Sequence, residues 1–170
     1  ASFMADTKNR GKILWFLITA RPDLLPIDLK RQGRAEEHIP LFYPETAAEY
    51  DEIFAVMKKK LGLKTAVAHL GEVADEAQLL GLSGSDLEAI LVRSVLEAEA
   101  AESPEIRPEH LRKAFADFIP TTDSVEREMQ ILCAVLECTS RELLPARYRD
   151  LDRSAIRERI AEIKNGLRAG

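Results

Sequence analysis

The chain has 170 residues, enough for one ordinary domain or two small ones. Apolar residues make up 46%, charged residues 31% and aromatic residues 6%, a mixture that favours a helix-rich protein with a packed core. The net charge of -5 argues against a general nucleic-acid binder, because such proteins usually carry excess positive charge. The longest apolar run, residues 13–18, is too short to cross a bilayer and no signal-peptide pattern is present, so a cytoplasmic protein is expected.

The cysteines and histidines give no sign of a disulfide or a metal site. Cys133 and Cys138 are five residues apart, so on a helix their side chains point about 140° from each other. We interpret them as buried thiols of a protein in a reducing compartment. His38, His69 and His110 are isolated, and none has a second ligand at helical spacing, so no metal is expected.

The start of the chain has the pattern of part of an α/β unit. Residues 13–19 form a continuous apolar run, typical of a strand buried on both faces. Residues 22–34 can hold one short helix, and residues 39–43 are again strand-like, with Pro40 favouring a sheet edge or a strand start. Because two strands alone cannot make a stable sheet, residues 1–44 are interpreted as a remnant of a larger α/β domain.

After residue 44 the pattern changes to helices. The first is predicted over residues 45–62, with a capping box formed by Thr46 and Glu49 at its start and Gly62 at its end. Three consecutive lysines suit the negative C-terminal end of its dipole. Its apolar residues form one stripe: Tyr50, Ile53, Phe54, Met57 and Leu61.

Three further helices are predicted before residue 120. The second covers residues 66–81, the third has Ser85 as N-cap with Glu88 closing its box, and the fourth has Pro108 in its first turn. The expected buried face of the third consists of Leu87, Ile90, Leu91 and Val95. Short loops join all four, so residues 45–120 are expected to form a compact helical subdomain.

Residues 121–170 add two predicted helices, over 121–144 and 152–167. In the last one, an apolar residue recurs every three to four positions: Ile156, Ile160, Ile163 and Leu167. This narrow seam can pack on the helical subdomain or on a partner helix. No motif identifies a function for this tail.

No complete catalytic site can be assembled from the chain. The only Gly-Lys pair, Gly11-Lys12, leads into a predicted strand rather than a helix, which is the wrong context for a phosphate-binding loop. No strand ends in paired acids that would hold magnesium. Three scattered histidines offer no credible nucleophile–base pair.

Two motifs, in order, resemble the AAA+ ATPase family. The apolar run followed by "TARPD" and "DLKRQGRAE" resembles a strand ending in Thr-Asn-Arg-Pro-Asp and then Leu-x-Arg-Pro-Gly-Arg in that family. "GLSGSDLEAIL" resembles the Gly-Phe-Ser-Gly-Ala-Asp-Leu segment of its small lid domain. The resemblance implies a mainly α chain of three parts: residues 1–44 from the large α/β nucleotide-binding subdomain, residues 45–120 as a four-helix lid, and residues 121–170 as a helical C-terminal extension.

The resemblance gives the arginines near the start a role. In AAA+ rings an arginine from the neighbouring subunit faces the γ-phosphate, whose oxygens gain charge during hydrolysis, and a guanidinium offers planar donors with a permanent charge. It implies that Arg31 and Arg34 are such fingers, with Gly33 letting the loop turn between them. The alternative is two solvated arginines that pair with Asp28 or Glu36.

The sensor position departs from the family pattern. Ala20 stands where the family's strand usually ends in a polar residue, most often Asn, and alanine cannot hydrogen-bond a water or a phosphate oxygen. Two alternatives follow: Thr19 takes over this catalytic role, or hydrolysis is weak. Gln32 replaces the usual proline, and Glu37 stands where a further basic residue is common.

The lid motif implies nucleotide contacts. Gly84 and Ser85 fall where the family's Gly-Ala pair lies against the base and the ribose, and Ile53 and Met57 fall where side chains cover the adenine. The alternative is a helix N-cap and plain core.

The phosphate loop and the magnesium-binding acids, which precede this region in the family, are missing from the sequence. The chain is therefore interpreted as the C-terminal portion of an ATPase that in full length binds ATP and Mg, forms a homo-oligomeric ring and remodels an unknown protein substrate. This chain alone is expected neither to bind ATP tightly nor to hydrolyse it, and no membrane or nucleic-acid partner is expected. The alternative is a non-enzymatic helical module that binds a partner protein.

Overall fold

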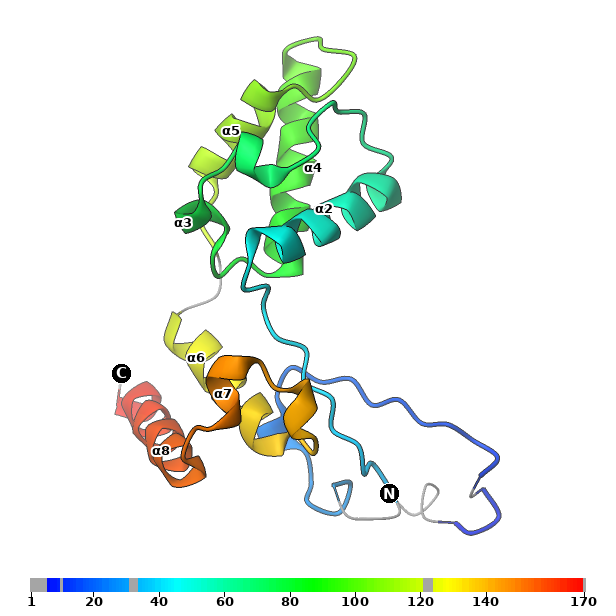
Figure 1. Cartoon of the computed structure of the whole chain (residues 1–170), viewed down its shortest axis with the longest axis vertical. Coiled ribbons are helices and arrows are strands. Elements are labelled where there is room, and N and C mark those ends of the chain that lie inside the picture. Colours follow the sequence, from blue (N-terminus) through cyan, green and yellow to red (C-terminus); the bar gives the residue numbers. More distant parts are fainter. Residues whose placement is uncertain (1–5, 10, 31–33, 121–123, 170) are drawn as a thin grey trace. The chain divides into compact units, whose positions relative to one another are not determined.

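The computed structural model describes residues 6–9, 11–30, 34–120 and 124–169, and these residues are mainly helical, which confirms the predicted class (Figure 1). The chain divides into two compact units. Unit 1 contains residues 1–42 together with 122–170, so it joins both ends of the chain, whereas unit 2 is the continuous stretch 43–121. None of the described helices is long and apolar enough to span a bilayer.

Unit 2 is built from α2 (Ala47–Leu61), η2 (Leu70–Glu72), α3 (Glu76–Leu79), α4 (Gly84–Ala100) and α5 (Pro108–Asp117). α4 and α5 lie side by side, and α2 contacts α4, α3 and η2 (Figure 1). Their apolar faces form one core, whose most deeply buried members include Tyr50, Phe54, Leu70, Leu87, Ile90, Leu91 and Leu111. This core fixes α2 against α4, which carry all four residues of the predicted lid contacts.

The first helix of unit 2 has the predicted caps. Thr46 Oγ1 accepts a hydrogen bond from the backbone N–H of Glu49 at 3.3 Å, and the Glu49 carboxylate accepts one from the N–H of Thr46 at 3.2 Å. Gly62 ends the helix with a φ of 64°, which glycine adopts without strain. The predicted apolar stripe is also confirmed, because Tyr50 and Phe54 are buried and its other three members pack against the core.

The predicted second helix over residues 66–81 is wrong. Only η2 and the four-residue α3 form in this range. The Glu72 carboxylate accepts hydrogen bonds from the backbone N–H groups of Ala68 and His69, at 2.9 and 2.8 Å, and these bonds lower the pKa of Glu72. The Asp75 carboxylate caps the start of α3 by accepting a hydrogen bond from the N–H of Gln78 at 2.8 Å. These local caps take up the backbone groups that a continuous helix would pair internally.

The third predicted helix, α4, begins two residues earlier than expected. Its N-cap is Ser83 rather than Ser85: Ser83 Oγ accepts from the N–H of Asp86 at 3.1 Å, and the Asp86 carboxylate accepts from the N–H of Ser83 at 2.8 Å. Glu88, predicted to close the box, instead pairs with Lys60 of α2 at 2.9 Å. The predicted buried face of α4 is confirmed.

Unit 1 contains η1 (Pro22–Leu24), α6 (Ser124–Glu137), η3 (Arg141–Leu143), α7 (Ala146–Arg149) and α8 (Arg153–Ala169). α6 packs against both α8 and η1. The unit has its own core of buried side chains: Met129, Cys133, Val135, Leu144, Ile156, Ile160 and Ile163. Three residues of the predicted seam lie in this core, so the seam packs within unit 1, while the side chain of Leu167 lies outside the described part.

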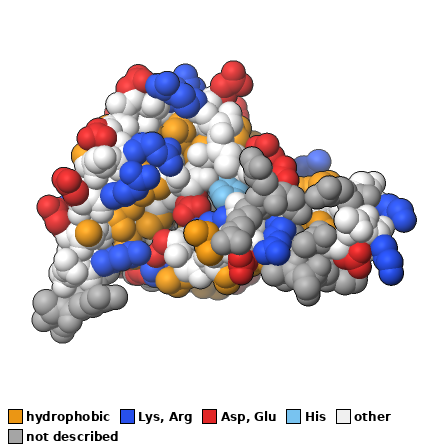
Figure 2. Space-filling view, turned by 90° about the horizontal axis from the view of Figure 1, so that it is seen from below, with side chains coloured by type: hydrophobic (Ala, Val, Ile, Leu, Met, Phe, Trp, Pro, Cys, Tyr) orange, Lys and Arg blue, Asp and Glu red, His pale blue; other side chains and the backbone are white. Residues whose placement is uncertain are grey.

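Neither predicted strand forms in the described chain. No strand is present among the described residues, and residues 13–19 have no regular secondary structure and exposed side chains, with Ile18 95% exposed. In the second segment Leu41 is 91% exposed. A strand is stable only where neighbouring strands take its backbone hydrogen bonds and cover its side chains. The α/β part of the predicted fold is therefore not seen among the described residues. Figure 2 shows a surface on which apolar side chains lie exposed between charged ones.

Candidate functional site

Two of the four predicted lid contacts, Met57 and Gly84, lie close together at the start of α4 in unit 2. A methyl group placed on Gly84 would lie 3.8 Å from Cε of Met57, an ordinary van der Waals contact. Ile53, one turn before Met57 on α2, is half-buried and packs on the same core. Ser85 is exposed in the first turn of α4. The structure therefore brings Met57 and Gly84 together and leaves Ser85 open to solvent.

The backbone at this junction is held from both helices. The buried Tyr50 hydroxyl on α2 donates to the carbonyl oxygen of Leu82 at 3.0 Å, just before α4. The pair Lys60–Glu88 links the same two helices on the surface. The predictions from sequence missed the Tyr50 contact, because nothing local in the chain links residues so far apart.

The charge at this junction suits a neutral group better than a phosphate. A helix N-terminus attracts anions, but here the Asp86 carboxylate already accepts hydrogen bonds from the Ser83 N–H and from Ser83 Oγ, at 2.8 and 2.7 Å. A second negative group would be repelled by Asp86. The apolar Met57 side chain beside Gly84 can instead cover the flat face of a base.

The predicted catalytic residues lie in unit 1. Thr19 is exposed, and its Oγ1 accepts a hydrogen bond from the N–H of Arg21 at 3.0 Å. Arg34 Nη1 donates to the carbonyl oxygen of Asp28 at 2.5 Å and lies 3.9 Å from the Asp28 carboxylate. The Arg34 guanidinium thus contacts the aspartate that the alternative interpretation named. Arg31, the other predicted finger, lies outside the described residues.

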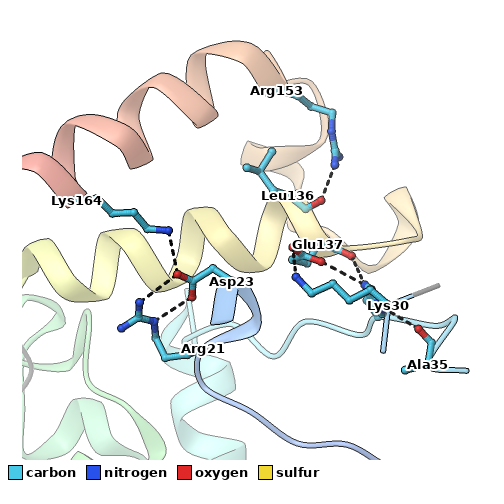
Figure 3. A network of polar contacts seen from close by, with 9 residues as sticks. Arg21, Asp23, Lys30, Ala35, Leu136, Glu137, Arg153 and Lys164 are labelled. Carbon is cyan, nitrogen blue, oxygen red and sulfur yellow. Dashed lines mark hydrogen bonds and ion pairs between the residues drawn. The ribbon is translucent and has the colours of Figure 1, made fainter. Parts of the chain in front are cut away.

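A polar network that the sequence did not predict ties this N-terminal segment to the tail (Figure 3). Asp23 lies between two cations: Arg21 Nε and Nη2 reach its carboxylate at 3.0 and 3.1 Å, and Lys164 Nζ of α8 reaches it at 3.0 Å. The hydrogen bonds from Arg21, followed by that from Lys164, lower the pKa of Asp23 from 3.8 to about 2. η1 is therefore fixed on α8 as well as on α6.

This shift predicts a defined loss of unit 1 stability in acid. Because the pKa of Asp23 is lower in the folded chain, its contribution is fully present above about pH 4 and is lost as the pH falls towards 2. We expect Asp23→Asn to lower the free energy of unfolding at pH 6 by about 1–2 kcal/mol, after allowance for solvent screening around Arg21. Urea unfolding followed by the NMR signals of α6 and α8 measures it. A difference from the parent chain that is as large at pH 2 as at pH 6 would contradict this account.

The two thiols and the described clusters of acids point to no second site. Cys133 is buried in the unit 1 core, and burial raises the pKa of its thiol, which keeps it protonated and unreactive. Cys138 is only half-buried, unlike the predicted fully buried thiol, and its Sγ donates to the carbonyl oxygen of Ser140 at 3.0 Å. Within the described part of the chain no group of three His, Cys, Asp or Glu side chains could hold a metal ion.

Comparison with known proteins gives one similarity along most of the chain. The chain is 27% identical over 164 residues to the "Cell division cycle protein 48 homolog" of Archaeoglobus fulgidus. The similarity covers 96% of this chain and 20% of that protein, so the chain spans about a fifth of the length of its relative. No family model matches the chain, and a search of the solved structures gives no significant match.

Proposed function

We propose that the chain is the C-terminal part of an AAA+ ATPase and supplies arginine fingers and a nucleotide-covering lid to an oligomeric ring. The similarity to the archaeal Cdc48 homolog carries this proposal, because it runs through 96% of the chain rather than through one motif. The AAA+-like motifs at residues 19–36 and 81–91 both fall within a chain that is similar almost from end to end.

The geometry of unit 2 supports the lid role. Met57 and Gly84 come from two different helices, and a methyl group placed on Gly84 would touch the end of the Met57 side chain at the start of α4. The Tyr50 hydroxyl fixes the backbone beside them. The apolar Met57 side chain beside a glycine, near the Asp86 carboxylate that would repel a phosphate, suits the adenine and ribose end of ATP. In this proposal the phosphates bind to another part of the protein.

The exposed apolar segments of unit 1 fit the same proposal. Residues 13–18 are all apolar, and each is at least 40% exposed, which would be costly for a free-standing protein. We propose that residues 13–19 and 39–43 become strands in a parallel sheet whose other strands come from the remainder of the longer protein. In that setting the backbone groups pair and the side chains are covered on both faces.

The test is nucleotide binding and hydrolysis by the longer gene product and by this chain alone. The longer product should hydrolyse Mg-ATP and form a ring. Phosphate binding needs backbone amides at a helix start, a lysine and a magnesium ligand, and these are expected in the remainder of the longer protein. Calorimetric titration of the isolated 170-residue chain with Mg-ATP should detect no binding with a Kd in the micromolar range. A longer product without ATPase activity would instead favour the helical interaction module, with residues 13–18 as its contact surface.

A further inference from the structure

One residue of the tail holds both ends of the segment that carries Arg34. Glu137 is the last residue of α6, and its Oε1 lies 2.6 Å from Nζ of Lys30 (Figure 3). The two side chains are only 28% and 18% exposed, so the pair is partly shielded from solvent. The contact joins positions 107 residues apart in the chain.

His38 reaches the same residue from the other side of Arg34. Its Nδ1 lies 2.8 Å from the carbonyl oxygen of Glu137 and 3.7 Å from the Glu137 carboxylate, and its Nε2 lies 2.9 Å from the carbonyl oxygen of Ala35. The backbone of His38 is also held by the tail, because its N–H donates a hydrogen bond to Thr139 Oγ1 at 3.0 Å. Cations and N–H donors suit this place, which is the negative end of the α6 dipole.

A backbone hydrogen bond links described residues on the two sides of positions 31–33. The N–H of Ala35 donates to the carbonyl oxygen of Leu29 at 3.1 Å, next to Lys30. Arg34 directly precedes Ala35 in the chain, and its guanidinium donates to the carbonyl oxygen of Asp28. Arg34 is thus flanked in the chain by two contacts on Glu137, one from Lys30 and one from His38, and we define these two contacts as the clamp.

We propose that Glu137 is a positioning residue for Arg34, through which the C-terminal extension holds the finger segment in place. The inference rests on the proposed function for the role of Arg34, while the clamp itself stands on the contacts above. Transfer of a phosphoryl group is sensitive to placement, and a shift of about 1 Å at a positioned group can cost about a hundredfold in rate. The tail, which carries no recognised motif, gains a function by this route.

The first measurement uses this chain and needs no ATPase activity. In Glu137→Ala, hydrogen exchange at the amides of Ala35 and His38 should quicken about tenfold or more, because the clamp that shields them opens. Glu137→Gln keeps the side-chain shape and should give a smaller increase, which guards against simple misfolding. Glu142→Ala, at an exposed position of the same tail, is the control and should leave both amides unchanged. Equal protection in all four proteins would overturn the clamp.

The second measurement uses the longer gene product. Glu137→Ala should lower kcat for ATP by about 10- to 100-fold and leave KM unchanged, because Arg34 acts on the transition state across a subunit boundary. Exchanging the charges in Lys30→Glu with Glu137→Lys should restore part of the rate that each single change removes. A KM effect without a kcat effect, or no rescue by the exchange, would overturn the positioning role. If the unmodified longer protein has no ATPase activity, the proposed function is refuted, and the hydrogen-exchange measurement on the 170-residue chain still decides whether the clamp exists.

Discussion

Under the proposed function, replacing Arg34 by alanine is expected to lower the turnover of ATP by the longer protein about a thousandfold, while nucleotide affinity stays nearly unchanged. In that function the guanidinium acts where charge develops on the γ-phosphate oxygens, whereas the ground-state nucleotide would be held mainly by the phosphate loop of its own subunit. The measurement is kcat for Mg-ATP hydrolysis together with the Kd of a non-hydrolysable analogue.

The control for this prediction is the partner that Arg34 contacts in the structure. If Arg34 served only its surface pair with Asp28, 3.9 Å away at the carboxylate, then Asp28→Ala would give the same phenotype as Arg34→Ala. Such exposed pairs contribute only about 0–1 kcal/mol of stability, so both variants would then hydrolyse ATP near the parent rate. A finger role predicts a large loss for Arg34→Ala and a small effect for Asp28→Ala.

Mixed rings separate an action across subunits from one within a subunit. Subunits carrying Arg34→Ala are combined with subunits that have intact arginines but a disabled phosphate loop. Some sites then pair an intact pocket with an intact finger from the neighbour, so activity should recover on mixing. No recovery at any ratio would place Arg34 outside the active site of the adjacent subunit.

Local signals explain which helices could be predicted from the sequence. α2 has its cap, its apolar stripe and its glycine stop within seventeen residues, and each of these features acts between neighbours. The predicted start of α4 is two residues too late, because the sequence offers two serines that each have an acid three residues later. The structure uses Ser83 with Asp86, which frees Glu88 for the contact with Lys60 on another helix. Only tertiary contacts decide between two such equivalent local patterns.

Long-range contacts explain what the sequence could not reveal. Residues 13–19 have the composition of a buried strand, but strand formation depends on neighbours, and the described residues supply none. The family resemblance named Met57 and Gly84 as expected nucleotide contacts, but no pattern in the sequence pointed to the Tyr50 contact beside them. The charged contacts of Lys30 and Asp23 with the tail span more than a hundred residues, so no spacing rule could pair them.

The largest stability effect is expected at Phe54, the most buried aromatic side chain of unit 2. It is 0% exposed, and Nζ of Lys58 lies 5.2 Å from the centre of its ring. Phe54→Ala removes this ring from the core and leaves a cavity, which typically costs about 3–5 kcal/mol. A unit of this size has only about 5–10 kcal/mol of stability, so the variant should be close to unfolding.

The measurement must report on unit 2 alone. Trp15, the only tryptophan, belongs to unit 1, so its fluorescence is unsuitable. The opening free energy from hydrogen exchange at the buried amides of α4 gives the value directly. Val56→Ala, at a position on the same helix that is 66% exposed, is the matched control and should cost less than about 0.5 kcal/mol. A loss below about 1 kcal/mol in Phe54→Ala would mean that α2 is not anchored by this ring. Other core residues of unit 2 would then have to hold α2, and with it Met57, beside Gly84.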